Sequence, residues 1–540
     1  MDQPFKLSDP IEEFIVAVEA EVQRKSQLKL KKKEVSDEEA NQIAYWYEKI
    51  RAAIDYREDH LLRRTAARRI LKRICIFEGR TSGIADTLLK ELIMGGYLKK
   101  EDLDEEKLAA VDKIMQKYSY AFTLTGGSIP LADSKSSEKR RWLTTLASFE
   151  IEEILYPATE RRALVTAMYK LLAPRVVIEN QNVPEPQKNV HVYMAVYRSL
   201  AKADRAMAAS ELFRVYFPDW FAEPNQSRIA EIVNNLDRIA ASIYAEARGV
   251  LANKIFHAIK KQAYFSQILL EVTTDNPEDI RGVVAQEYIL RDFVKKKVAE
   301  NNDRVYKKLQ KRISRGIVYI FLTKMLFALL VEVPFERFMD GKINYVALAT
   351  NLIFPPLFMA FLAKSARFPD AANTEAIVEG VENLVYDDPA KDEIKKISVG
   401  SSLEGFSDNA LNTIYFFVFS AVFGLLIYIL HALHFDYVSG GIFLIFMCTV
   451  SFFGALIRQS VRELSVRKEK ESIGSLFFDT MLLPFVRFGR WIATNFSRIN
   501  FFMFILDVII EAPFRMIIRL FEAWIVFLRK KREEIDQQFG

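Results

Sequence analysis

Cysteine is almost absent from this chain: its 540 residues include only Cys75 and Cys448. Cys75 lies in a basic helical stretch, whereas Cys448 lies in an apolar run that we expect inside a membrane, so the two are not expected to pair. The sequence therefore offers neither a disulfide framework nor a thiolate metal site.

Glycine is missing from residues 128–248, so tight turns between strands are scarce there. Apolar residues at three- and four-residue spacing predict helices on both sides of the proline- and asparagine-rich segment 180–189. We therefore predict an all-α fold, with one cytoplasmic helical subdomain at 1–180 and a second at 188–312 that leads into the membrane.

A few prolines predict where helices begin and end. Ser8 or Asp9, followed by Pro10, is typical of a helix start, because proline suits the first helical position. Pro157 and Pro174 each follow an amphipathic stretch and predict its end.

The short motifs that identify common enzymes are also missing. The chain contains no G-x-x-x-x-G-K-[ST], G-x-G-x-x-G, H-E-x-x-H or G-x-S-x-G. The acidic pair Glu152 and Glu153 lies in an amphipathic helix, where a solvated face explains it. We predict a protein that is not an enzyme and has no cofactor; the alternative is an enzyme whose active-site residues are scattered along the chain.

One histidine cluster has part of a metal-ligand pattern. His431 and His434 are three residues apart and share a helix face, and Asp436 follows two residues later. Because no fourth ligand accompanies them, we predict no metal site.

Long runs without charge are present after residue 313. Residues 410–433 and 438–457 contain no lysine, arginine, aspartate or glutamate, and Asp436 lies between the two runs. Each run meets the roughly 20-residue length needed to cross a bilayer. Two further apolar runs precede them. We predict four transmembrane spans within 313–458, at 316–333, 343–363, 410–433 and 438–457, with a cytoplasmic link at 364–409.

Basic residues predict how these spans are oriented. They cluster before the first span at Lys295, Lys296, Lys297, Arg304, Lys307, Lys308, Lys311, Arg312 and Arg315, and they recur in the link and after the fourth span. The turn between the third and fourth spans contains none. The positive-inside rule then places both termini and the link in the cytoplasm, in a plasma or inner membrane. The first 14 residues are acidic and lack the apolar core of a secretory signal.

The sharpest site candidate is Lys324, a cation near the middle of the first predicted span. Glu332, or Asn351 or Thr350 in the second span, could partner it, and the pair Pro355–Pro356 is expected to break that span. These residues describe either a transporter-like polar site between spans one and two or an ion pair that fixes helix packing.

Two basic surfaces are candidates for anionic lipid headgroups. Arg64, Arg68 and Lys72 recur every four residues and make one stripe, although a solvated face or a nucleic-acid surface would give the same pattern. Arg515 and Arg519 belong to the apolar but charged segment 473–540. We predict amphipathic helices on the membrane surface there, with a tilted transmembrane hairpin as the alternative.

The sequence as a whole predicts a multi-pass membrane protein whose cytoplasmic helical domain is a scaffold for protein partners or anionic lipid. Nucleic acid is not an expected partner on this interpretation. The alternative function is a transporter or channel that uses Lys324 and the proline pair. Four spans enclose little space, so this alternative requires a homo-oligomer.

Overall fold

The computed structural model of the chain is about 85% helical, which confirms the all-α prediction. It describes residues 7–31, 59–80, 82–125, 134–179, 183–222, 224–277, 279–339, 344–366, 368–386, 395–398, 408–467 and 473–498. The chain divides into two compact units. Unit 1 comprises Met1–Glu300 and Thr374–Glu404, and unit 2 comprises Asn301–Asn373 and Gly405–Gly540.

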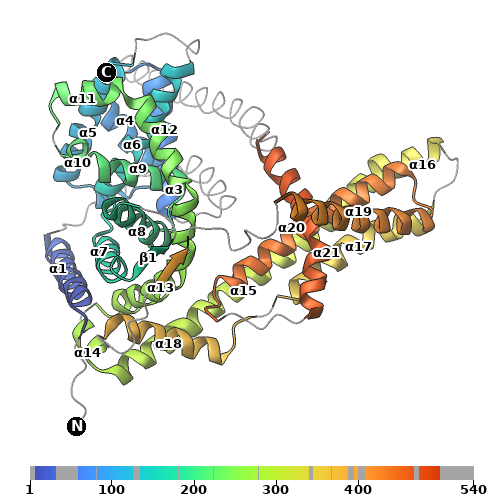
Figure 1. The fold of residues 1–540 in the computed structure, drawn as a ribbon. Helices are drawn as coiled ribbons and strands as arrows, with labels where there is room; N and C mark the ends of the chain where they lie inside the picture. Colours follow the sequence, from blue (N-terminus) through green and yellow to red (C-terminus); the bar gives the residue numbers. More distant parts are fainter. Residues whose placement is uncertain are drawn as a thin grey trace, which may run out of the picture. The chain divides into compact units, whose positions relative to one another are not determined.

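The N-terminal part of unit 1 is built almost wholly of helices (Figure 1). Its elements are α1 (Asp9–Lys31), α3 (Asp59–Leu71), η1 (Lys72–Phe77), α4 (Ile84–Met94), η2 (Lys100–Asp102), α5 (Glu105–Thr123), α6 (Ser134–Leu155), α7 (Thr159–Leu172), β1 (Val176–Glu179), α8 (Glu185–Leu200), α9 (Arg205–Tyr216), α10 (Pro218–Phe221), α11 (Gln226–Asn234), α12 (Leu236–Ala247), α13 (Val250–Asp275) and α14 (Ile280–Ala285). Helix α8 packs along α13, and α1 packs along α7.

A buried charge network lies in the core of unit 1. The Lys117 ammonium on α5 donates to both carboxylate oxygens of Glu150 on α6, at 2.9 and 2.7 Å, and to the backbone oxygen of Trp220, at 2.9 Å. The Tyr118 hydroxyl donates to Glu150 at 2.6 Å, and the Trp220 indole donates to Tyr118 at 3.1 Å. Burial lowers the pKa of Lys117, and the Glu150 carboxylate opposes that shift. The network joins α5, α6 and α10.

The polypeptide between two apolar helices of unit 2 returns to unit 1. It contains most of α18 (Ala371–Val385) and β2 (Lys395–Ser398), and β2 pairs in parallel with β1, Val176 opposite Lys395. The backbone N–H of Ser8 donates to the Val385 carbonyl at 2.9 Å. A Cβ added to Gly380 would collide with the Phe265 ring. The described residues 374–386 and 395–398 of the predicted link therefore belong to unit 1.

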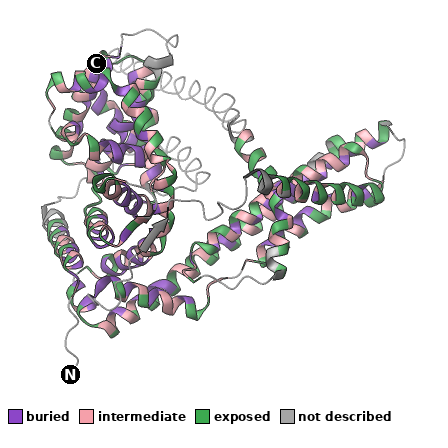
Figure 2. Cartoon of the chain, viewed as in Figure 1, coloured by how far each residue is buried: buried purple, intermediate pink, exposed green. Residues whose placement is uncertain are grey.

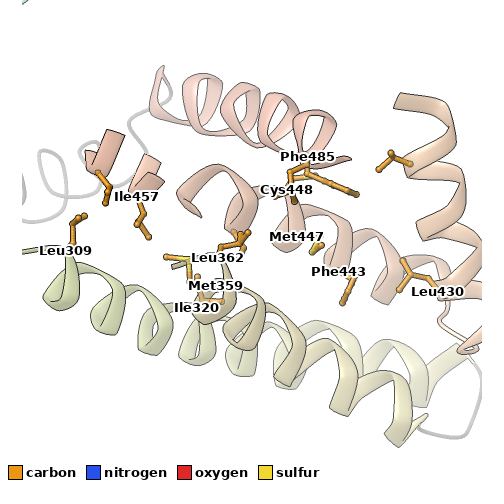
Figure 3. Packing of buried hydrophobic residues seen from close by; sticks show 14 residues of the cluster. Leu309, Ile320, Met359, Leu362, Leu430, Phe443, Met447, Cys448, Ile457 and Phe485 are labelled. Carbon is orange, nitrogen blue, oxygen red and sulfur yellow. The ribbon is translucent and has the colours of Figure 1, made fainter. Parts of the chain in front are cut away.

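Unit 2 contains the long apolar helices. Its elements are α15 (Glu287–Phe327, from Asn301 on), η3 (Ala328–Glu332), α16 (Val333–Met339), α17 (Tyr345–Lys364), α19 (Asp408–Ala432), α20 (Tyr437–Arg462) and α21 (Ile473–Arg498). Buried residues from α15, α17, α19, α20 and α21 form one cluster (Figure 3). Figure 2 shows that α19 is exposed over most of its length, as expected of a helix that faces lipid.

The two ends of unit 2 are defined by contacts between its helices. At the connecting end, where the chain passes to unit 1, Tyr306 packs on Phe368, with ring centroids 5.1 Å apart. The Asn373 amide at this end donates to the Leu464 carbonyl at 3.1 Å. At the distal end, the Glu336 carboxylate accepts from the Asn344 backbone N–H at 2.9 Å. Helix α15 and its continuation therefore run along α17 in the opposite direction.

Three helices of the described residues are long and apolar enough to cross a membrane, not the four predicted: α17, residues Tyr415–Ala432 of α19, and α20. The predicted span 316–333 is the exception. It is the end of a 41-residue helix rich in charge, it changes to π hydrogen bonding at Ala328, and it carries Lys324 and Glu332. The placement of both termini in the cytoplasm stays a prediction.

Helix α21 packs along α20 in the opposite direction. Asp479 forms an ion pair with Arg458, and a Cβ at Gly489, ten residues after Asp479, would collide with the carbonyl of Cys448, ten residues before Arg458. The expectation that 473–540 lies on the membrane surface stays a prediction, and residues 499–540 lie outside the described part of the chain.

Candidate functional site

The Lys324 side chain is fully buried in unit 2 and forms an ion pair with Glu332, at 2.7 Å from Nζ to Oε1. The two residues are eight positions apart, which on an α-helix would separate them by about 80° around the axis. The π turn Ala328–Glu332 has more residues per turn, so each residue advances less around the axis and Glu332 turns back toward the Lys324 face. The local change of helix type therefore makes the ion pair.

The remaining surroundings of this pair are largely apolar. The Lys324 ammonium lies 4.8 Å from the centroid of the Phe446 ring on α20, a cation–π distance. The second carboxylate oxygen of Glu332, Oε2, is buried and has no hydrogen-bond partner among the described residues. The ion pair is thus desolvated but not fully satisfied.

Asn351 and Ser439 form a second polar contact, between α17 and α20. The Asn351 amide donates to the Ser439 carbonyl at 3.4 Å. In the described part of the chain, neither Asn351 Oδ1 nor Ser439 Oγ has a hydrogen-bond partner, although both residues are buried. Two of the sequence candidates, Lys324 and Glu332, are therefore brought into direct contact, whereas Asn351 is bonded to α20 instead.

Pro355 and Pro356 are both buried inside α17, which continues through them from Tyr345 to Lys364. The predicted helix break is therefore wrong. Each proline removes the donor of one intrahelical hydrogen bond, so the carbonyls of Asn351 and Leu352 lose their usual partners. Transmembrane helices tolerate such losses when neighbouring groups or water satisfy the freed carbonyls. The loss places one more acceptor at Asn351, beside its unpaired side-chain oxygen.

Polar caps close the distal end of unit 2. The Asn344 side chain accepts from the backbone N–H groups of Val346 and Ala347 and donates to the His434 carbonyl at 2.9 Å. Asp436 caps α20 by accepting from the Ser439 N–H at 2.9 Å. His434 and Asp436 therefore act in helix termination, and the described residues contain no cluster of three or more metal-ligating side chains.

The polar groups around Lys324 in unit 2 leave hydrogen-bond donors and acceptors available. Lys324 uses one of its three N–H donors on Glu332, and side-chain acceptors of Glu332 and Asn351 have no partner among the described residues. Such a set suits a bound water, a proton or a small cation between helices rather than covalent catalysis.

The three residues of the basic stripe predicted in unit 1 differ in exposure. Arg64 is buried and forms an ion pair with Asp204 at 2.5 Å, so it cannot reach a lipid headgroup, and its inclusion in an exposed stripe was wrong. Arg68 and Lys72 are exposed, and the Lys72 ammonium lies 5.5 Å from the centroid of the Phe77 ring. Arg515 and Arg519 lie outside the described residues.

Sequence reasoning missed Ser439 and Phe446 as neighbours of the polar site, and it missed Glu336, which is buried and accepts from the Asn344 N–H. Glu336 had a usable signal, since it follows Glu332 by four residues and lies on the same side of a helix. Ser439 and Phe446 had none, because only the packing of α20 on the other helices brings them close. No protein-family model, curated protein or solved structure matches this chain.

Proposed function

We propose that this protein is a membrane-anchored helical scaffold, in which the apolar helices of unit 2 hold unit 1 at one membrane face for a protein partner or anionic lipid. The observation that supports this most directly is the return of the link to unit 1. Segments that precede α15 and segments that follow α17 belong to one packed unit, through the Ser8 contact with Val385 and the β1–β2 pairing. A packed unit lies on a single side of a bilayer, so this proposal requires the apolar end of α15 to cross it together with α17, although charge and hydropathy keep that end out of the count of three apolar helices.

The distribution of charge favours the cytoplasm for that side. At the connecting end, exposed basic residues include Lys308 and Lys311 on α15 and Arg462 on α20. At the distal end, the described helix ends present Asn344, His434 and Asp436, and the described residues 333–339 contribute one exposed cation, Arg337. Lysine and arginine are retained on the side of synthesis.

Labelling of single cysteines in a Cys75→Ala, Cys448→Ala background tests this proposal. Glu101→Cys reports the N-terminal part of unit 1, Asn383→Cys reports α18, and Tyr437→Cys reports the distal end; all three positions are exposed. In whole cells, an impermeant maleimide should label only Tyr437→Cys, and in inverted vesicles only the other two. Labelling of Glu101→Cys and Asn383→Cys from opposite sides would reject the proposal.

A second candidate function is a homo-oligomeric transporter or channel. The unpaired buried atoms Glu332 Oε2, Asn351 Oδ1 and Ser439 Oγ favour it, because buried polar groups in apolar surroundings are costly unless water or a ligand satisfies them. Proton and potassium flux into proteoliposomes should then exceed that of empty vesicles, and Lys324→Met should abolish it. Lys364→Met, at the exposed end of α17, is the matched control. Wild-type flux equal to that of empty vesicles would reject this candidate.

A further inference from the structure

The connecting-end portion of α15 carries four exposed basic residues on a single face. Lys308, Lys311 and Arg315 follow Arg304 by four, seven and eleven positions, so on a helix with 3.6 residues per turn the four fall within about 60° of one another. We name these four residues the α15 basic stripe. None of them has an ion-pair partner among the described residues, whereas the neighbouring Lys307 is paired with Asp303.

The opposite face of the same helix is the one that packs. Leu309 and Ile320 are buried in the unit 2 cluster, and Val305, Ile313 and Ile317 pack against it. Leu309 and Ile320 point from α15 toward that cluster in Figure 3. The α15 basic stripe therefore lies on the exposed face of α15, opposite the unit 2 cluster.

Along this outward face, the character of the surface changes abruptly. Immediately after Arg315 come the exposed side chains of Val318, Tyr319 and Leu322, which are 54%, 68% and 52% accessible. Leu322 is seven residues beyond Arg315 and continues the same face. A row of cations followed by exposed apolar side chains, with a tyrosine at the change, matches the order of headgroup, interface and hydrocarbon in a bilayer.

We infer that the α15 basic stripe binds the phosphate groups of anionic phospholipids at the membrane face from which unit 1 projects. This inference rests on the proposed membrane anchoring and adds the lipid class and the residues that select it. Duplex nucleic acid also attracts clustered cations. It does not explain why the same face continues into exposed hydrocarbon-like side chains, and a lipid surface does.

The test uses the full-length protein in a neutral detergent and follows its thermal unfolding as phosphatidylglycerol is added. A ligand that binds only the folded protein raises the unfolding temperature in proportion to its saturation. The variant Lys308→Gln, Lys311→Gln, Arg315→Gln should need a roughly hundredfold higher lipid concentration for half of the effect, because each juxtamembrane cation contributes about fivefold. Raised salt should weaken the wild-type response.

Two further variants keep the result interpretable. Lys308→Arg, Lys311→Arg retains the charge and should bind as the wild type does. Lys90→Gln, Lys99→Gln, Lys261→Gln removes three exposed lysines of unit 1 and should also leave the response unchanged. Equal loss in this control, or a wild-type response from the stripe variant, would overturn the inference.

Other ligands complete the comparison. Phosphatidylcholine should give no charge-dependent shift, and inorganic phosphate at the same concentration should give none. An equal shift with inorganic phosphate, or a shift with duplex DNA alone, would assign the stripe to another ligand. Carbonate extraction of membranes tests the anchor separately. A protein that stays in the membrane but does not discriminate between lipids contradicts only this inference, whereas an extracted protein contradicts the proposed function.

Discussion

Both units bury a lysine beside a glutamate, yet they satisfy the charges differently. In unit 1, the Lys117 ammonium has both oxygens of Glu150 and the Trp220 carbonyl as acceptors, and Tyr118 adds a further donor to the carboxylate. Helices from three parts of the chain meet in this network. Every member has a partner, so the network specifies one arrangement of α5, α6 and α10.

In unit 2, Lys324 has Glu332 alone as an ionic partner among the described residues, with the Phe446 ring nearby. Buried oxygens remain open at Glu332 and Asn351 in this part of the chain. A buried pair with one contact does little for stability, because desolvation offsets most of its attraction. The difference teaches that every charge of the unit 1 network is satisfied within the protein, whereas unit 2 leaves buried oxygens without a partner among the described residues.

The largest expected effect comes from breaking the unit 1 network. Glu150→Leu should lower the free energy of unfolding by about 5 kcal/mol, because it leaves a buried lysine without its counter-charge and the Tyr118 hydroxyl without its acceptor. Chemical denaturation of the full-length protein, followed through unit 1, measures this. Glu101→Leu, at an exposed position, is the control and should change stability by less than about 0.5 kcal/mol. A loss of the same small size at Glu150 would contradict the role given to the network.

The matching change in unit 2 should lower the free energy of unfolding by less, and a second substitution should restore it. Glu332→Leu leaves Lys324 buried without a carboxylate and should lower stability by about 3 kcal/mol. Lys324→Met with Glu332→Leu should restore or exceed wild-type stability, because no third group of the described residues depends on the pair. The corresponding double change at Lys117 and Glu150 should not recover, since Tyr118 still lacks its acceptor. Unfolding in detergent compares the four variants, and a double variant of unit 2 as unstable as the single one would refute the distinction.

The sequence predicted the fold best where local chemistry decides it. Pro157 and Pro174 were expected to end helices, and α6 ends at Leu155 and α7 at Leu172. The β1–β2 pairing could not be predicted, because two four-residue strands more than 200 positions apart leave no periodic signal. The span count differs for another reason: residues 316–333 are the end of a long charged helix that changes to π hydrogen bonding at Ala328, so they do not form a separate apolar helix.

The candidate site was predictable in its residues but not in its geometry. Lys324 and Glu332 stood out because charges in apolar runs are rare. Their contact depends on a π turn, which no residue type predicts. Arg64 shows the converse. Its four-residue spacing to Arg68 correctly places both near one helix face. Arg64 is nevertheless buried, because it forms an ion pair with Asp204, which is distant in the sequence.

A smaller effect concerns a buried ionisable group of unit 1, His191. Its Nε2 lies 3.8 Å from Glu246, near Arg198, and burial lowers the pKa of His191 below 6.5 despite the carboxylate. The unfolded chain therefore takes up the proton first, and stability should fall as the pH drops below 6.5, by at most about 1.4 kcal/mol per pH unit. His191→Gln should flatten this slope in denaturation experiments between about pH 5 and 7. His257→Gln, at an exposed position, should not, and an unchanged slope in His191→Gln would assign the pH dependence elsewhere.

The smallest expected effect tests the open oxygens of unit 2 directly. The Asn351 amide makes one long hydrogen bond, at 3.4 Å, and its oxygen has no partner in the described residues. If the amide contributes only these contacts, Asn351→Leu loses about as much as it gains and should change the free energy of unfolding by less than about 1 kcal/mol. Asn344→Leu is the matched change at a satisfied asparagine, and loss of the α17 cap and of the bond to His434 should cost about 1–2 kcal/mol. A larger loss at Asn351 than at Asn344 would mean that the open oxygen holds a buried water or ion, because only a satisfied acceptor is costly to remove.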